Sequence, residues 1–362
     1  MADISDFTDP LVAEIYASYE RKYGNEPPRP YLGASIIGRE CKRSLWYGLR
    51  WARQEKFDGR KLRLFQSGHL AEPRFIADMR ATGATIYDSD PATGKQFSFA
   101  DLGGHFRGNM DGAGTKIPGA GQQWCVLEFK THSSKSFTEL KKHGVQKAKI
   151  EHWTQMNTYM GWSSMERAIY LAVNKDTDEL HSERLAFDPV FFEKTRMKAD
   201  EIIFGDTPPA KISEDPKFYL CGWCPHKDVC HGNQVPNLSC RTCVHATPER
   251  EGDGRWSCAQ HPEGRASTIP IHVQREGCPA HLPLPFLLTY ANPVDAGHGW
   301  IEFRRKDTGA TFHVAVEGVT PPGPPAPTYT SKEIAAVKDY RILCDQQVEE
   351  FKTEFPGSRL VG

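Results

Sequence analysis

The chain has 362 residues, a formal net charge of −1 and 39% hydrophobic residues. This composition predicts a globular protein of two or three domains, and no apolar run approaches the roughly 20 residues of a membrane span. The near-neutral charge neither indicates nor excludes nucleic-acid binding, because an enzyme needs only a local basic groove. The acidic first six residues lack the apolar segment of a signal peptide, so we expect a cytoplasmic protein.

The first two hundred residues show the periodicities of an α/β core. Apolar residues at helical spacing predict helices over 9–23, 35–51, 61–82, 147–161 and 189–204. Alternating and β-branched segments predict strands over 85–87, 96–100, 104–111, 124–130, 167–173 and 179–187. In the third helix we expect the core-facing residues to be Leu62, Phe65, Leu70, Phe75 and Met79.

From Pro208 the composition changes, and Pro, Cys and His dominate as far as His281. Residues 300–316 predict a hairpin, residues 321–327 a stiff Pro-rich linker, and residues 330–351 a helix opened by the capping box of Thr330 and Glu333. We therefore divide the chain into a core (1–235), a Cys-rich metal module (236–285), a hairpin extension (286–320) and a linker with a C-terminal helix (321–362).

The segment 126–130, Val-Leu-Glu-Phe-Lys, carries the clearest chemical signal. Side chains alternate along a strand, so Glu128 and Lys130 share one face while Leu127 and Phe129 point into the core. Asp111, on the preceding predicted strand, supplies a second acid. Two carboxylates can hold a hard divalent cation, and an ammonium can orient water and stabilise charge on a phosphate. The pattern predicts the centre of a metal-dependent phosphodiesterase.

Four short motifs follow one another in the chain. They are Gly68-x-x-x-Glu72, Asp111-Gly112, Glu128-x-Lys130 and Gln155-x-x-x-Tyr159. Their order over about residues 32–230 resembles the PD-(D/E)xK nuclease superfamily, in particular the lambda exonuclease/YqaJ branch and the RecB-like nuclease domains. The resemblance implies a restriction-endonuclease-like fold, in which a mixed central sheet is flanked by helices.

The resemblance also implies roles for these residues. Asp111 and Glu128 would bind Mg²⁺ or Mn²⁺, the Leu127 carbonyl would be a further ligand, and Glu72 would lie near the metals. Lys130 would position the attacking water, and the groove would include Gln155 and Tyr159. Weaker candidates for DNA contact are Lys42, Arg43 and His69. Each motif has a plainer interpretation, an exposed strand face for Glu128 and Lys130, or packing for Gln155 and Tyr159.

The activity implied is that of a DNA exonuclease in phage-type recombination or repair, in the host cytoplasm and beside a single-strand annealing protein. Two alternatives stay open: a single-strand or structure-specific endonuclease of the same fold, and a non-catalytic DNA-binding assembly protein. End-directed or internal cutting, polarity and oligomeric state are also open, because they depend on how the groove closes.

Eight of the ten cysteines fall into two sets of four. In the first set, Cys221, Cys224 and Cys230 leave a tetrahedral site one thiolate short, and Cys41 is the natural fourth member. This pattern resembles the [4Fe–4S] staple of RecB-, AddB- and CRISPR-adaptation-type nucleases, with zinc as the alternative.

The second set has the spacing of a structural zinc knuckle, with an iron–sulfur cluster as the less favoured interpretation. Its members are Cys240, Cys243, Cys258 and Cys278, and the possible substitute ligands are His245, His261 and His281. The segment is poor in large aliphatic residues and would need a metal to fold. We expect the two remaining cysteines, Cys125 and Cys344, to be ordinary thiols.

Overall fold

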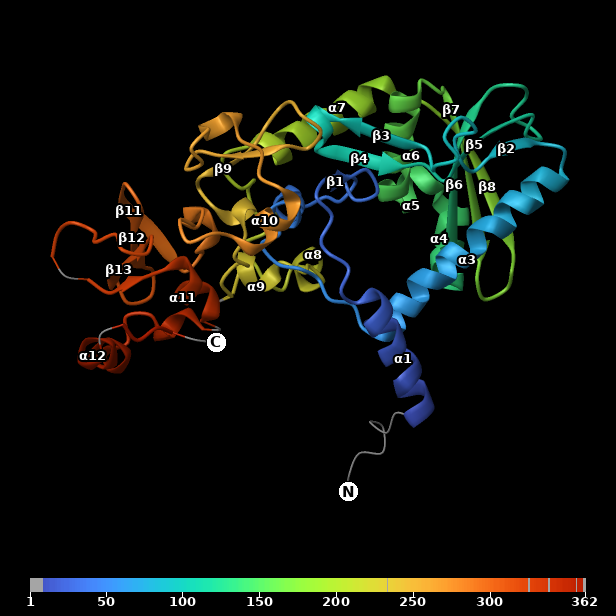
Figure 1. Ribbon diagram of the computed structural model, residues 1–362. Helices are drawn as coiled ribbons and strands as arrows, with labels where there is room; N and C mark the ends of the chain where they lie inside the picture. Colours follow the sequence, from blue (N-terminus) through green and yellow to red (C-terminus); the bar gives the residue numbers. More distant parts are fainter. Residues whose placement is uncertain (1–8, 233, 325, 338, 356, 361–362) are drawn as a thin grey trace.

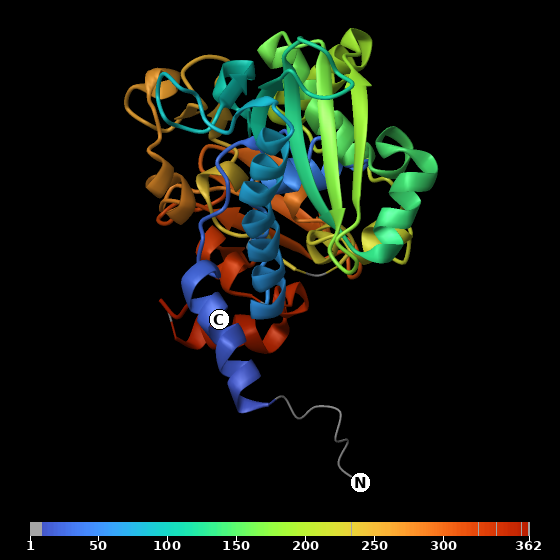
Figure 2. The same ribbon diagram turned by 90° about the vertical axis from the view of Figure 1, so that its right-hand side faces the viewer.

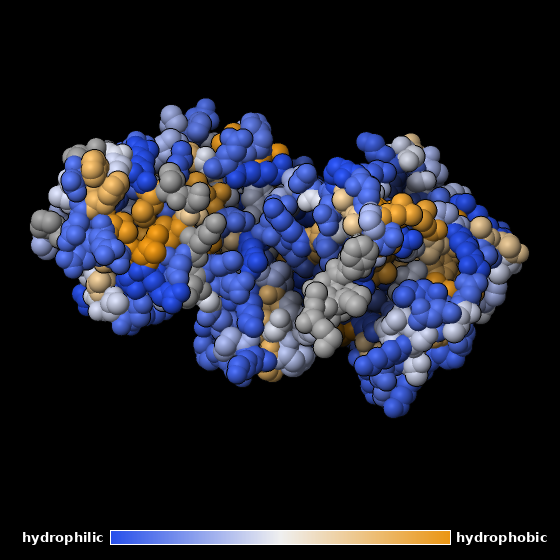
Figure 3. All heavy atoms as spheres, turned by 90° about the horizontal axis from the view of Figure 1, so that it is seen from below, coloured by the Kyte–Doolittle hydropathy of each residue, from blue (hydrophilic) through white to orange (hydrophobic). Residues whose placement is uncertain are grey.

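The computed structural model describes residues 9–232, 234–324, 326–337, 339–355 and 357–360. Residues 1–6, on which the cytoplasmic prediction rests, lie outside this range, as does residue 325 of the Pro-rich segment. The structure is a mixed α/β arrangement, with an N-terminal core on one side, a small C-terminal sheet on the other and Cys-rich segments between them (Figure 1). Seen from below, hydrophobic patches lie on both lobes within a mainly hydrophilic surface (Figure 3). In the described part of the chain, none of the helices has the length and apolarity needed to cross a bilayer.

The core contains seven α-helices among the described residues. They are α1 (Pro10–Tyr23), α2 (Lys42–Leu49), α3 (Gly59–Ala81), α4 (Ser134–His143), α5 (Val145–Ala148), α6 (Ile150–Ser163) and α7 (Pro189–Phe204). Its strands are β1 (Leu32–Gly33), β2 (Thr85–Tyr87), β3 (Ser98–Asp101), β4 (Phe106–Asn109), β5 (Gly112–Thr115), β6 (Cys125–His132), β7 (Arg167–Asn174) and β8 (Leu180–Ala186).

The main sheet has the order β2-β5-β6-β7-β8, and β6 and β7 are its parallel pair. A smaller sheet has the order β1-β4-β3. Helix α3 lies against one face of the main sheet (Figure 2). Phe75 of this helix stacks on Phe129 of β6, with ring centres 5.2 Å apart. On the opposite face, Val126 belongs to the same buried cluster as Met156 of α6. The alternation predicted for β6 is therefore confirmed.

The strand predicted over 104–111 is confirmed as β4 but is shorter, because Met110 and Asp111 leave β4 and link it to β5 in the other sheet. The helix predicted over 35–51 is reduced to α2, and the one over 147–161 is broken at Lys149, whose φ is −140°. Helix α4 was not predicted from the sequence. Period-two and helical patterns do not show where a chain leaves one sheet for another.

Two of the residues expected to face the core from α3 do not. Phe65 is 43% exposed and Leu70 is 70% exposed, whereas Leu62, Phe75 and Met79 are buried. Helix α3 packs against α1 near its start and against the main sheet near Phe75. The intervening turns are only partly covered.

The C-terminal half contains α8 (Tyr219–Gly222), α9 (Lys227–Cys230), β9 (Ala246–Pro248), β10 (Trp256–Cys258) and α10 (Ile271–Glu276). A four-stranded sheet follows, made of β11 (Ala291–Gly297), β12 (Trp300–Arg305), β13 (Thr311–Ala315) and β14 (Thr328–Tyr329). The predicted hairpin is confirmed by the antiparallel pairing of β12 and β13. The single helix predicted over 330–351 is wrong, because α11 (Ser331–Ala336) and α12 (Gln346–Glu354) are separated by a 3₁₀ turn and by Cys344 at φ +64°.

The Cys-rich segment packs directly on the small sheet of the core. His105 Nε2 lies 2.9 Å from the carbonyl oxygen of Glu249, and Gly254 N donates to Gly103 O. A Cβ atom at Gly103, whose φ is +66°, would collide with the backbone of Arg250. This close approach needs glycine. The boundaries at 235, 285 and 320 stay predictions, and one buried cluster runs from the core into the C-terminal sheet.

Candidate functional site

The structure brings the acids and the lysine of the first three motifs together. Asp111 lies in the link between β4 and β5, and its Oδ2 accepts a hydrogen bond from Phe129 N over 2.9 Å. Lys130 Nζ forms an ion pair with Glu128 and lies 4.0 Å from Asp111 Oδ2. Glu72 projects from α3, and the charges of Asp111 and Lys130 both act on the pKa of its carboxyl. The change of sheet at Asp111 is what turns this carboxylate toward β6.

Burial dominates the electrostatics of the site. Glu128 is completely buried, and burial raises the pKa of its carboxyl well above the usual range. Its Oε2 has no hydrogen-bond partner among the described residues. For Lys130 burial acts to lower the pKa, but Glu128, Asp111 and Glu72 together raise it. Burial, followed by the charge of Asp111, raises the pKa of Glu72, while His69 opposes the shift.

The residues predicted on α6 line the same face of the sheet. Tyr159 donates to Asn109 O over 2.7 Å, and Gln155 Nε2 lies 3.5 Å from the Tyr159 oxygen. Gly108 permits this arrangement, because a Cβ atom there would lie 2.6 Å from the Tyr159 ring. Leu127 lies in mid-sheet, paired with a residue on each side.

Lys130 pairs with Glu128 and also lies near Asp111, so one ammonium faces two carboxylates. In the described part of the chain, no group of three or more His, Cys, Asp or Glu side chains is arranged to hold a metal ion as it stands. The donor set is nevertheless all oxygen, the type that Mg²⁺ and Mn²⁺ prefer. Within this set, Oε2 of Glu128 has no hydrogen-bond partner among the described residues.

Three residues near this face were missed from the sequence. Tyr170 of β7 is opposite Glu128 in the parallel register, and its hydroxyl bonds to both His132 and His152. The spacing of His152 from Gln155 and Tyr159, three and seven residues, is a helical signal that marks one stripe of α6.

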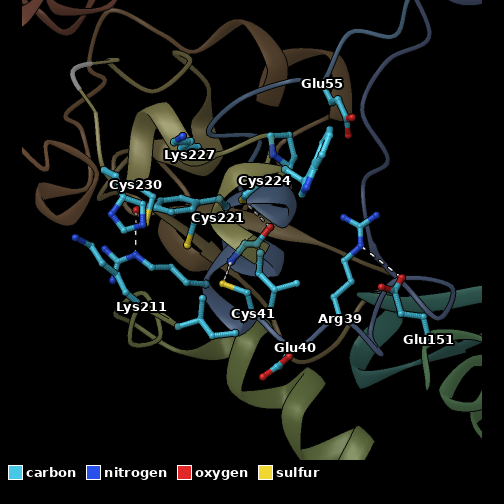
Figure 4. Close-up of a pocket in the computed structure, with 18 of the residues that line it drawn as sticks. Arg39, Glu40, Cys41, Glu55, Glu151, Lys211, Cys221, Cys224, Lys227 and Cys230 are labelled. Atoms are coloured by element: carbon cyan, nitrogen blue, oxygen red, sulfur yellow. Dashed lines mark hydrogen bonds and ion pairs between the residues drawn. The ribbon is translucent and has the colours of Figure 1, made fainter. Parts of the chain in front are cut away.

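The first cysteine set converges on one cavity of about 330 Å³ (Figure 4). Cys41, at the start of α2, accepts from Ser44 N over 3.4 Å, and Cys224 lies 3.4 Å from Ser44 Oγ. Burial raises the pKa of Cys221 and of Cys230, as expected for thiols away from water. The four predicted members therefore come together although residues 41 and 221 are far apart in the chain.

The weaker DNA-contact candidates lie near this cavity or on α3. Arg43 lines the cavity and donates to Tyr47 Oη and Pro209 O, while Lys42 pairs with Glu201 of α7 over 2.5 Å. His69 is exposed on α3, and its Nδ1 lies 3.4 Å from Glu72. None of these contacts tests a role in DNA binding.

The second cysteine set surrounds the β9–β10 hairpin. Burial raises the pKa of Cys240 to about 12 and of Cys243 to about 11, and the charges of Cys278 and Cys258 add to both shifts. His281 is buried and its Nε2 is already 3.0 Å from Ser239 O. The four cysteines are thus the better ligand candidates, and His281 has a structural contact.

Comparisons with known proteins give no family model and no curated protein that matches this chain. Among solved structures, the crystal structure of SSO0001 has a TM-score of 0.36 at 15% identity, covering 62% of this chain and 98% of that one. Two structures of the alkaline exonuclease LHK-Exo, one from Laribacter hongkongensis and one in complex with dAMP, each have a TM-score of 0.34 at 15% identity. Each covers 52% of this chain and 89% of that one.

Proposed function

We propose that this protein is a metal-dependent DNA nuclease that hydrolyses phosphodiester bonds. One observation carries the proposal: a fully buried glutamate, Glu128, has an unpaired oxygen beside Asp111 and Lys130. Burying a carboxylate costs free energy unless it is fully paired and hydrogen-bonded, so a buried glutamate with an unpaired oxygen points to a functional role. Acids with shifted pKa that converge at one place are typical of catalytic sites.

Asp111 and Glu128 would hold Mg²⁺ or Mn²⁺, with the Leu127 carbonyl and Glu72 as further ligands. When bound, the ion would supply an activated water and neutralise charge on the phosphate. Lys130 serves as the counter-ion of Glu128 in the metal-free protein. Once its carboxylate partner is engaged elsewhere, its ammonium is free to turn to the water and to a phosphate oxygen.

The polar residues of α6 would complete the groove. Tyr159 is anchored to Asn109 O, two residues before Asp111, so it ties α6 to the link that carries the acid. Gln155, one turn earlier, would donate toward substrate from the same stripe. DNA is the proposed substrate, and Lys42, Arg43 and His69 remain proposed contacts.

The finer assignment follows from the order of the motifs. We propose an exonuclease of phage-type recombination or repair that acts in the host cytoplasm, with a single-strand annealing protein as partner. An internal cutter of the same fold and a non-catalytic assembly protein are the alternatives that the experiment below separates.

For the first cysteine set we propose a [4Fe–4S] cluster. Its fit is supported by four thiols that line one cavity. Held there, the cluster would tie α2 to the segment 221–230 and so restrain the entrance to the core. Zinc is the alternative occupant.

For the second set we propose structural zinc held by Cys240, Cys243, Cys258 and Cys278. The four thiols lie around a hairpin of two three-residue strands, which has too small a buried cluster to be stable alone. Close thiols whose pKa values are raised lose their protons readily only when a cation binds them.

The proposal is tested by digesting linear duplex, circular duplex and single-stranded DNA with Mg²⁺. Asp111→Asn and Lys130→Met should abolish cleavage, while Glu139→Gln on the exposed face of α4 should not change it. Cleavage of linear but not circular duplex supports the exonuclease, and cleavage of circles supports an internal cutter. DNA binding without cleavage by the wild-type protein overturns the nuclease.

The metal assignments have their own test. Anaerobically purified protein should absorb near ~400 nm, as thiolate-bound iron–sulfur clusters do. Cys41→Ser should remove this absorbance, and the matched variant Cys125→Ser should retain it. A colourless protein that contains only zinc would refute the cluster, and a protein without zinc would refute the second assignment.

A further inference from the structure

A continuous chain of hydrogen bonds runs over the face of the sheet that carries Glu128 and Lys130, and the roles assigned above do not use it. Lys149 Nζ donates to Ser136 Oγ over 2.7 Å, and Ser136 Oγ lies 2.9 Å from His132 Nδ1. His132 Nε2 lies 2.8 Å from the hydroxyl of Tyr170, and the same hydroxyl lies 2.8 Å from His152 Nδ1. Five side chains from β6, α4, β7 and the start of α6 are thereby joined.

The direction of every bond in the chain follows from its first member. An ammonium group only donates, so Ser136 Oγ accepts a hydrogen bond from Lys149. The Ser136 hydroxyl then donates its own hydrogen bond to His132 Nδ1. His132 then carries its proton on Nε2 and donates to Tyr170. The Tyr170 hydroxyl, which accepts from His132, in turn donates to His152 Nδ1.

The opposite direction leaves one group unsatisfied. Were His132 to donate from Nδ1, the hydroxyl proton of Ser136 would need another acceptor, and the hydrogen bonds of the described residues provide none. Ser136 is half-buried, and a hydroxyl that loses its protein acceptor there gives up a hydrogen bond worth about 0.5–1.5 kcal/mol. The forward direction, in which each hydroxyl both donates and accepts, is therefore favoured.

Both imidazoles are held in the neutral form that this argument needs. Burial, together with the charges of Lys130 and Lys149, lowers the pKa of His132 to about 4 and of His152 to about 3. Tyr170 is completely buried and stays protonated, because burial and then Glu128 raise its pKa. At neutral pH neither imidazole carries a charge.

The last member of the chain, His152, joins it through Nδ1. Its proton is then on Nε2, and the hydrogen bonds of the described residues give that nitrogen no protein acceptor. Unlike Tyr170, His152 is only partly buried. It shares one stripe of α6 with Gln155 and Tyr159. Its partner Tyr170 is opposite Glu128 in the register of β6 and β7, so His152 lies over the face of β6 that also carries Lys130.

We propose that His152, fixed as the neutral Nε2–H tautomer by this chain, donates a hydrogen bond to a non-bridging oxygen of the DNA phosphate that lies beside Lys130. The inference rests on the proposed nuclease function and adds a substrate-binding residue to its site. A neutral donor has a distinct advantage there, because it binds phosphate without adding positive charge to a site that must also attract a cation. His132 and Tyr170 act as positioning residues.

The tautomer is measured without any reference to activity. The full-length protein labelled with ¹⁵N-histidine should show, by long-range ¹H–¹⁵N correlation, protons on Nε2 of both His132 and His152. Tyr170→Phe deletes only the hydroxyl oxygen that bridges His132 and His152. The fold should stay unchanged, whereas His152 should become a mixture of the two tautomers. A proton on Nδ1 of His152 in the wild-type protein would overturn the proposal.

The contact with phosphate is measured by steady-state cleavage of a linear duplex. His152→Leu should lower kcat/KM roughly 10- to 100-fold, the range for a hydrogen bond to a charged acceptor. The dependence of log(kcat/KM) on log[salt] should keep its slope, since no counter-ion is released by a neutral donor. His152→Gln, which restores an N–H donor, should recover part of the loss, and His143→Asn on exposed α4 serves as the control.

The outcomes separate this inference from the function on which it rests. Absence of cleavage by the wild-type protein overturns the nuclease, while the tautomer experiment still tests the hydrogen-bond chain. Cleavage that is unaffected in His152→Leu overturns the phosphate contact and leaves the nuclease intact. A reduced salt slope in His152→Leu also overturns it, because a charged histidine would then be the group that binds.

Discussion

The guanidinium carbon of Arg241 lies 3.9 Å from the ring centre of Trp51. The Arg241 side chain is completely buried and donates to Gln274 Oε1, Leu49 O and Pro30 O, each over 2.9 Å. Arg241, a side chain of the Cys-rich segment, is thus buried between two N-terminal segments of the core, those of Pro30 and Leu49. The positive charge of Arg241 is therefore stabilised by carbonyl dipoles and aromatic rings instead of by a carboxylate.

Arg241→Lys should lower the free energy of unfolding by about 3 kcal/mol, because an ammonium cannot reach three acceptors in a plane and stack on an indole. Denaturant unfolding measures the change. Arg265→Lys, on the exposed surface of the same segment, should change stability by less than about 0.5 kcal/mol. Equal stability of Arg241→Lys and wild type would show that the Cys-rich segment does not depend on this contact.

Binding of Mg²⁺ should stabilise the fold through the two central carboxylates. A ligand that binds only the native state contributes about 2.7 kcal/mol at a hundredfold excess over its Kd. The wild-type melting temperature should therefore rise when Mg²⁺ is added to protein prepared without a chelator, which leaves the metals proposed for the two cysteine sets in place. In Asp111→Asn and Glu128→Gln the rise should vanish, since each lacks one charged oxygen ligand.

Glu139→Gln is the matched control for this measurement, because Glu139 is an exposed acid on α4. Its melting temperature should respond to Mg²⁺ as the wild type does. An Mg²⁺ response that persists in Glu128→Gln would place the cation elsewhere and would remove the main argument for the site.

The sequence was informative where one local pattern decides the outcome. The alternation along 126–130 is enough to place Glu128 and Lys130 on one face and Leu127 and Phe129 on the other, because β6 is buried on both sides. The grouping of Cys221, Cys224 and Cys230 also followed from spacing, since thiols at x2 and x5 intervals already converge locally. A tetrahedral site then needs a fourth thiolate, and this requirement singled out Cys41.

Other features depend on tertiary contacts that no local pattern contains. The segment 104–111 reads as one strand, but its last residues turn into a second sheet, and this turn is what orients Asp111. Helix α4 is rich in lysine and contributes only Phe137 and Leu140 to the core, so its apolar stripe is too short to predict. Phe65 and Leu70 have helical spacing, but only neighbouring elements decide which stripe is covered.

Stability should fall as pH decreases from 6.5 toward 4, in part because of His105. This ring lies between Phe204 and Trp256, and burial lowers its pKa to about 4. In this interval the unfolded chain binds a proton that the folded chain does not, so each step down in pH favours unfolding. From the ordinary pKa of 6.5, the loss at pH 5 is about 2 kcal/mol for this one group.

His105→Phe keeps an aromatic ring but removes the titrating group, so its free energy of unfolding should fall about 2 kcal/mol less than that of the wild type between pH 7.5 and pH 5. Its stability at pH 7.5 should be lower by about 1 kcal/mol, because the bond to Glu249 O is lost. His143→Asn, an exposed change on α4, should keep the wild-type pH dependence. Parallel pH profiles for His105→Phe and wild type would refute the assignment.

Two glycines of the motif region should respond in opposite ways to a single methyl group. At Gly108 a Cβ atom would lie 2.6 Å from the Tyr159 ring and 2.8 Å from Ala34 Cβ, so Gly108→Ala should destabilise the fold by about 1–3 kcal/mol. At Gly68, inside α3, nothing lies within 4 Å of the new atom, and Gly68→Ala should stabilise by about 0.5–1 kcal/mol. Thermal unfolding of the two variants decides the matter, and a destabilised Gly68→Ala would mean that α3 has a neighbour at this point that the packing described above lacks.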